Sequence, residues 1–188
     1  MTLLEMKKKV LRLIEEINGQ NTLTDDPDIK EKLNDVINQI QFELARIKKI
    51  PARYEKAVNA GDEIDLSLTE NFYQLYSARL YDTDGKEQEI EIFEKFIDIP
   101  CDGTLKIKYY KYPVAITDTT IDEGYEFELT DDVLEVMPYG VAADLLKSDI
   151  SNNYGKIYAE RYETMKQQLD PRHSLGTIYI EEAYNGQW

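Results

Sequence analysis

The sequence predicts an α+β protein with a four-helix body, an antiparallel β lobe inserted into it and an extended C-terminal arm. Apolar residues recur at helical spacing in residues 1–50 and again in residues 130–170. Between these stretches apolar and polar residues alternate, and turn residues punctuate them. Two isolated helix pairs would bury little surface, so the simplest arrangement packs both pairs together. Residues 51–129 then form the inserted lobe, and residues 171–188 the arm.

The first helix is predicted to follow a capping box made by Thr2 and Glu5. Asn18-Gly19 is a natural stop for it. Its apolar face is expected to consist of Met6, Val10, Leu13, Ile14 and Ile17.

The second helix is predicted to begin with Asp26 as its cap and Pro27 as its first residue, because proline lacks only an N–H that has no partner there. Lys48 and Lys49 suit the negative end of the helix dipole, and Pro51 follows them. A single apolar stripe covers one side of this helix, so it is expected to pack on the first helix and one further element. The stripe comprises Ile29, Leu33, Val36, Ile37, Ile40, Leu44 and Ile47.

From Glu63 the apolar period changes to two, which predicts five or six antiparallel strands in a small sandwich or barrel-like lobe. Asp82-Thr83-Asp84-Gly85 and Pro100-Cys101-Asp102-Gly103 are predicted to be turns. The expected strand regions are 63–68, 72–81, 89–99, 105–112 and 125–129.

Two further helices are predicted after Thr130. Pro138 is expected to open the first of them, with Val141 and Leu145 on its inner face. The second begins after Ser151 and stops at Asp170-Pro171.

The 188-residue chain has 22 basic and 37 acidic side chains, a net charge of −15. Attachment to nucleic-acid backbones and to anionic membranes depends on basic patches, so this charge argues against both. No run approaches the roughly 18 consecutive apolar residues of a membrane span. Residues 1–9 also lack the apolar stretch and cleavage site of a signal peptide. A protein made and kept in a cytoplasm is expected.

The charge is unevenly distributed. Residues 1–50 carry nine basic and nine acidic side chains, whereas residues 51–129 carry eight and eighteen, a net charge of −10. Residues 130–188 carry five and ten. The acidity therefore belongs to the inserted lobe and the C-terminal part.

The single cysteine, Cys101, and the single histidine, His173, exclude an internal disulfide, a zinc finger, a cysteine-histidine protease and a two-histidine metal site. Cys101 lies beside Asp102, whose charge disfavours a thiolate, and His173 has no recognisable partner. We therefore predict no enzyme, no catalytic residue and no cofactor.

Asp82-x-Asp84-Gly85 with Glu91 resembles part of a calcium loop, but Leu80 occupies its first ligand position, so a hairpin turn is the preferred interpretation. Adjacent acidic pairs are expected by chance in so acidic a chain, and those found are interpreted as caps and loop residues rather than a metal site. These pairs are Asp122-Glu123, Asp131-Asp132 and Glu181-Glu182.

The fourteen tyrosines are the less common feature. Tyr154, Tyr158 and Tyr162 share one helical face, which is either an ordinary half-buried face or a contact between subunits, since tyrosine is enriched at protein interfaces. The aromatic C-terminal arm is expected to pack on its own domain or to add to a partner's sheet. The arm residues predicted to bind a partner are Ile178, Tyr179, Ile180, Tyr184 and Trp188.

Three parts of the chain together carry a resemblance to a known family. The first is the segment from Met137 to Asp149, followed by a helix with Tyr158 and Tyr162. The others are the N-terminal helix pair, with its Leu33, Asn38, Leu44 pattern, and Tyr109-Tyr110-Lys111-Tyr112-Pro113. On these features residues 2–169 resemble the head-to-tail connector proteins of tailed bacteriophages, also called adaptor or head completion proteins.

The resemblance implies a structural protein of the virion neck, assembled in the host bacterial cytoplasm. Such proteins form a ring, commonly dodecameric, that docks under the portal protein, extends the DNA channel and joins tail or stopper proteins. DNA would pass without specific binding, and a negative lining would let the duplex slide. The family has no catalytic residues to transfer.

Two other functions stay open. One is an acidic inhibitor that mimics DNA and occupies a basic protein groove, although the neutral first fifty residues do not favour it. The other is a hydrolase with an oxygen-bound metal, for which the sequence contains no convergent motif.

Overall fold

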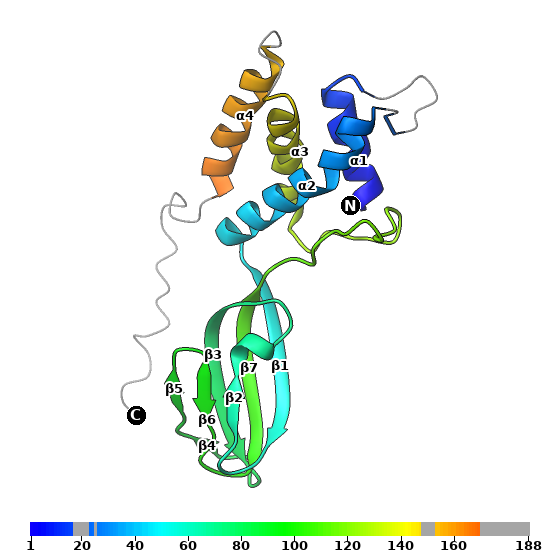
Figure 1. The fold of residues 1–188 in the computed structure, drawn as a ribbon. Helices are drawn as coiled ribbons and strands as arrows, with labels where there is room; N and C mark the ends of the chain where they lie inside the picture. Colours follow the sequence, from blue (N-terminus) through cyan, green and yellow to red (C-terminus); the bar gives the residue numbers. More distant parts are fainter. Residues whose placement is uncertain (17–22, 25, 148–152, 170–188) are drawn as a thin grey trace.

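The computed structural model describes residues 1–16, 23–24, 26–147 and 153–169. Within these residues the chain forms four helices and seven strands, and the strands lie between the second and third helix (Figure 1). The helices pack at one end of the molecule and the strands at the other. The predicted α+β class, with four helices and antiparallel sheets, is therefore confirmed.

The first two helices begin where their capping residues predict. Helix α1 (Leu3–Leu13) follows the capping box of Thr2 and Glu5, in which both reciprocal hydrogen bonds are present. Helix α2 (Pro27–Ile47) begins at Pro27, and the Asp26 carboxylate accepts the backbone N–H of Asp28 at 2.8 Å. The predicted stop at Asn18-Gly19 lies outside the described residues.

Helix α3 (Asp131–Leu145) corrects the prediction that Pro138 opens a helix, because Pro138 lies inside it. A proline inside a helix removes one backbone hydrogen bond. The turns before it nevertheless stay helical, since Val133, Val136 and Met137 are all buried there. Helix α3 contacts α1, α2 and the last helix, α4 (Tyr154–Leu169), and is the central helix of the body.

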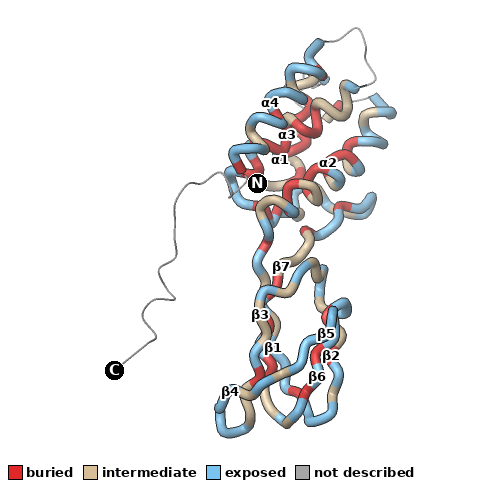
Figure 2. The backbone as a smooth tube through the Cα atoms, turned by 90° about the vertical axis from the view of Figure 1, so that its left-hand side faces the viewer, coloured by how far each residue is buried: buried red, intermediate tan, exposed pale blue. Residues whose placement is uncertain are grey.

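The lobe is a sandwich of two antiparallel sheets (Figure 2). The larger sheet has the order β1 (Ile50–Val58), β7 (Gly103–Lys111), β3 (Phe72–Asp82), β4 (Glu87–Gln88). The smaller has the order β2 (Glu63–Asp65), β6 (Phe96–Asp98), β5 (Glu91–Phe93). Between them lies a core separate from that of the helices, which contains Val58, Ile64, Leu66, Leu80, Ile97, Ile99, Leu105, Ile107 and Tyr109.

The strands differ from the prediction in three places. Strand β1 starts at Ile50, well before the first predicted strand, and tolerates Pro51 because it is an edge strand. The region 89–99 is not one strand but the hairpin β5–β6, which turns at Glu94 with a φ of 54°. The region 63–68 forms only the short β2 and one 3₁₀ turn, which leaves Leu68 84% exposed.

The predicted last strand, residues 125–129, is wrong. Phe127 and Leu129 are buried as their alternation suggests, but they pack into the helical core together with Ile116. The segment's one ladder contact is an isolated bridge between Glu126 and Thr2. Residues 114–129 thus pack on the helical body rather than in the sandwich, and the last strand of the lobe ends at Lys111.

Side chains of α2 hold this returning segment. The Asn38 side chain donates to the Ile116 carbonyl at 2.7 Å and accepts the Ile116 N–H at 2.8 Å, as a paired strand would. The neighbouring Gln41 is fully buried, donates to Asn38 and to the Val114 carbonyl, and accepts the Tyr125 hydroxyl at 3.1 Å. Both N–H groups of the Gln41 side chain thereby have acceptors. Its Oε1 shares the single proton of the Tyr125 hydroxyl with the Val114 carbonyl.

None of the helices within the described ranges has the combination of length and apolar character needed to cross a bilayer.

Replacing Asn38 by alanine is expected to lower the free energy of unfolding by about 1–2 kcal/mol, because the Ile116 backbone loses both partners. Urea denaturation would measure this loss. Gln39→Ala, one residue along the same helix on an exposed position, serves as the control and should stay within about 0.5 kcal/mol of the wild type. Equal stability of both variants would show that the side chain of Asn38 does not hold the segment.

Candidate partner-binding surfaces

The three tyrosines predicted to make subunit contacts lie on one face of α4 but differ in environment. Tyr154 is 54% exposed, Tyr158 is half-buried and Tyr162 is only 6% exposed. The Tyr158 hydroxyl donates to the Leu13 carbonyl at the end of α1, at 2.8 Å. The face therefore runs from solvent into the core, and its outer end is the part accessible to a partner.

Tyr162 is a core residue. Its ring covers Gly140 of α3 so closely that a Cβ there would lie 2.7 Å from the ring. Its hydroxyl is buried and makes no hydrogen bond of ordinary geometry to another described residue. Burial raises the pKa of Tyr162, and the nearby carboxylate of Glu43 raises it further.

Tyr158 belongs to an aromatic group at the surface of the helical body. Its ring stacks on Tyr154, with centroids 6.2 Å apart, and lies against Tyr139 of α3. The Arg161 guanidinium covers the Tyr139 ring at 4.2 Å. Tyr139 and Arg161 also line a hollow of about 360 Å³ between α1, α3 and α4. Both apolar and cationic groups are thus available to a partner at this end of the molecule.

The tyrosines of residues 109–112 have a different role, because most of them lie where the lobe meets the helical body. The Tyr112 ring lies between Tyr73 of β3, at 4.6 Å, and Phe42 of α2, at 5.6 Å. Lys49 covers the Tyr110 ring at 5.0 Å and donates to Gln74. Lys111 forms an ion pair with Glu128 of the returning segment. We call Phe42, Lys49, Tyr73, Tyr110 and Tyr112 the aromatic joint.

One residue of each described acidic pair has a structural partner. Asp122 pairs with the nearly buried Lys7 at 2.9 Å. Asp132, in the first turn of α3, accepts the Thr130 hydroxyl, which holds the pKa of its carboxyl below the ordinary value, as does the nearby Lys48. In the described part of the chain, no group of three or more His, Cys, Asp or Glu side chains is arranged to hold a metal ion.

The loop that resembles a calcium site is a hairpin turn, as preferred from the sequence. The Asp82 carboxylate accepts the backbone N–H groups of Asp84 and Lys86 at 3.0 and 2.9 Å. These bonds close the turn between β3 and β4, where Gly85 has a φ of 79°. Cys101 lies between β6 and β7 and packs against the lobe core.

The predicted arm residues, Ile178, Tyr179, Ile180, Tyr184 and Trp188, lie outside the described residues, as do His173 and Glu181-Glu182. Their partner-binding role stays a prediction.

The outer faces of the sandwich carry charges that were not predicted from the sequence. On β7 the lysines Lys106 and Lys108 alternate with buried residues and therefore share the outer face of the larger sheet. On β2, β5 and β6 the outward residues are mostly acidic. The alternation of lysines is visible in the sequence, but which strands stand beside each other is not, so the gathering of charge on each face could not be predicted.

No protein-family model and no curated protein matches this chain.

Removal of single tyrosine hydroxyls should affect the stability of the protein differently at Tyr158 and Tyr162, as measured by thermal unfolding. Tyr158→Phe is expected to cost about 1 kcal/mol, because the Leu13 carbonyl loses its donor. Tyr162→Phe should be neutral or stabilising, since it removes a buried hydroxyl that has no ordinary hydrogen bond. A loss in Tyr162→Phe as large as that in Tyr158→Phe would contradict this assignment.

Proposed function

We propose that this chain is a structural subunit of a tailed-phage or prophage head-to-tail connector. In this proposal several copies form a ring beneath the portal, extend the DNA channel and receive the tail or a stopper protein. The proposal rests on the sequence resemblance described above and on the following features of the fold.

The observation that carries the proposal is the division of the chain into two separately packed ends. The helical body and the sandwich each have their own core, and they lie at opposite ends of an elongated molecule (Figure 1). A subunit between two larger assemblies needs a distinct surface for each of them. The aromatic joint supports this role, because it fixes how one end is oriented relative to the other.

Charge also supports a conduit. The chain carries a net charge of −15, and polyanionic DNA is held mainly by basic side chains. Acidic residues of the returning segment, among them Asp118, Glu123 and Glu126, are exposed beside the helical body or at its edge. A ring of such subunits would repel the duplex from its wall and let it slide.

One structural observation favours the alternative, an acidic mimic of DNA. Three carboxylates, Glu63, Asp98 and Glu91, stand in a row across the smaller sheet. A mimic would present such a row to a basic protein groove. The cations on the opposite face of the same lobe are less suited to that function.

Co-expression with the portal protein encoded in the same genome tests the proposal. Native mass measurement should show a complex of the portal with a whole ring of this chain. Removal of residues 171–188 should weaken that complex, while the Lys32→Glu variant, altered on the exposed side of α2, should assemble normally. A chain that neither binds the portal nor occurs in particles would contradict the connector function. If that chain also blocked a nucleic-acid enzyme, the DNA mimic would be favoured.

A further inference from the structure

The two outer faces of the sandwich carry opposite charges. We call Arg53, Arg79, Lys106 and Lys108, with Tyr76 and Tyr110, the basic face. It lies on the larger sheet, where its residues alternate with the buried Leu105, Ile107 and Tyr109. We call Glu63, Asp65, Glu91 and Asp98, with Phe93 and Phe96, the acidic face. It lies on the smaller sheet, whose inner residues are Ile64 and Ile97.

Two cations of the basic face stand directly opposite each other, and neither forms a salt bridge with a described residue. Arg53 of β1 is the cross-strand partner of Lys108 of β7. Lys106 pairs with Glu55, and Arg79 with Glu87, each at 3.5 Å. Arg53 and Lys108 have no such carboxylate among the described residues. Like charges in directly opposed positions destabilise a sheet.

The same two cations border a hollow. Arg53, Lys108, Tyr76 and Tyr110 contribute to the lining of a hollow of about 410 Å³ on this face. The Tyr76 ring is 67% exposed and meets Tyr110 edge to face, at 5.9 Å. Exposed tyrosine and arginine around a hollow are the side chains enriched at the centres of protein interfaces.

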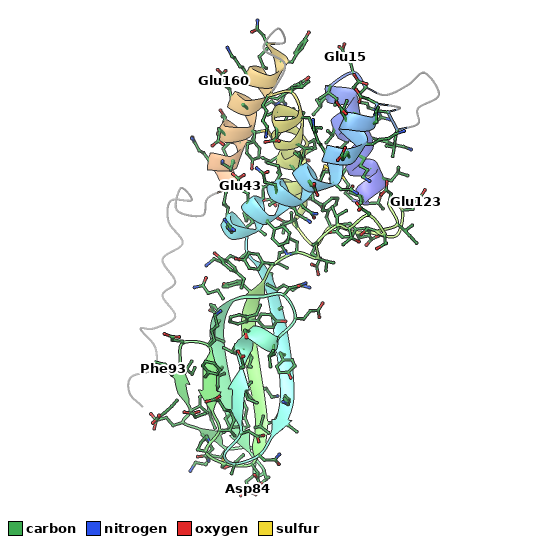
Figure 3. The ribbon with its side chains drawn as sticks, in the orientation of Figure 1. Glu15, Glu43, Asp84, Phe93, Glu123 and Glu160 are labelled. Atoms are coloured by element: carbon green, nitrogen blue, oxygen red, sulfur yellow. The ribbon has the colours of Figure 1, made fainter. Side chains whose placement is uncertain are left out.

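The acidic face has the complementary arrangement. Glu63, Asp98 and Glu91 are direct cross-strand neighbours on three adjacent strands, and no ion pair joins them to a basic side chain in the described residues. Two residues further along the strands, the next cross-strand row of this face consists of Asp65, Phe96 and Phe93. Phe93 is 73% exposed, and Figure 3 places it at the outer side of the lobe. This face thus combines exposed aromatic rings with three carboxylates that form no salt bridge with a described residue.

We propose that the basic face of one copy binds the acidic face of a second copy, so that the lobes associate head to tail. Directly opposed residues of a sheet lie about 5 Å apart at Cβ, so the Arg53–Lys108 pair has the same spacing as neighbouring carboxylates in the acidic row. Docking reduces the repulsion between like charges on both faces, because each group then lies against charges of opposite sign. It also places the apolar ring of Phe93 in the hollow beside Tyr76.

The positions of the two faces determine the kind of assembly. They lie on opposite sides of one sandwich, so a docked copy keeps one free face of each sign. Such a heterologous contact propagates from copy to copy and closes into a ring where the rotation permits. Closure into a ring rests on the proposed connector function, whereas the pairing of the two faces does not.

A second copy fits the basic face better than a nucleic acid does. The whole chain repels a polyanion with its net charge of −15, and two of the four cations already have carboxylate partners. A second copy instead supplies the missing carboxylates at a matching spacing. Nucleic-acid binding is the competing outcome of the test.

Two double variants test the pairing by analytical ultracentrifugation at low salt. Arg53→Glu with Lys108→Glu should make both faces acidic. Glu63→Lys with Asp98→Lys should give the cross-strand row that also contains Glu91 a net positive charge. Each variant alone is expected to lose self-association by about tenfold or more. An equimolar mixture should regain it, because every contact then joins opposite charges. Thermal unfolding checks that both variants fold.

The control is Lys32→Glu with Lys156→Glu, which changes the net charge as the first variant does but at exposed positions of the helical body. It should associate like the wild type. A wild-type chain that stays monomeric, or a mixture that regains nothing, would overturn the pairing. The pairing would also be overturned if the Arg53→Glu, Lys108→Glu variant lost binding to oligothymidine but kept the self-association of the wild type. If the face pairing fails but the chain still forms rings on the portal, the connector function remains supported. If the faces pair but the chain does not bind the portal, only the connector function is refuted.

Discussion

The return of the chain from the lobe to the helical core is the constraint on which the rest of the fold depends, and the pairing of the Asn38 side chain with the Ile116 backbone anchors it. The chain leaves the helical body at the end of α2, builds a lobe of seven strands and must return to the same core before α3 begins. Asn38 gives the returning segment a donor and an acceptor at the spacing of a backbone. Ile116, Phe127 and Leu129 can then enter the helical core.

This return also completes the first helix. The N–H groups of Leu3 and Leu4 have no partner within α1, and they donate to the carbonyls of Tyr125 and Asp122 at 3.0 and 3.1 Å. Lys7 meets the Asp122 carboxylate nearby. One loop thereby joins the start of α1 to the middle of α2, and α3 follows it into the centre of the body. The aromatic joint, in turn, holds the lobe in one orientation on that body.

The sequence predicted the features that local chemistry determines. The capping box at Thr2 and the Asp26-Pro27 start depend on residues a few positions apart, so both helix starts were correct. The prediction that Pro138 opens a helix was wrong, because burial of the turns before it outweighs the one backbone hydrogen bond that proline removes. Residues 125–129 alternate as a strand does, yet they line a helical core, since alternation reports burial on one side and not the identity of the partner. The two charged faces depend on the order β1-β7-β3-β4 and β2-β6-β5, which pairs strands distant in the chain.

Opposite charge on the two sides of one lobe is the property that unites the fold with the proposed assembly. A net charge of −15 alone suggests only repulsion, whereas the opposite charges on the two sheets would give each copy a site for its neighbour in the proposed assembly. Electron cryomicroscopy of the neck of intact particles tests this most directly. We expect a ring of this chain in which Arg53 and Lys108 of each copy lie against the Glu63, Asp98 and Glu91 row of the next. A neck that lacks the chain, or a ring in which both faces are open to solvent, would contradict the account.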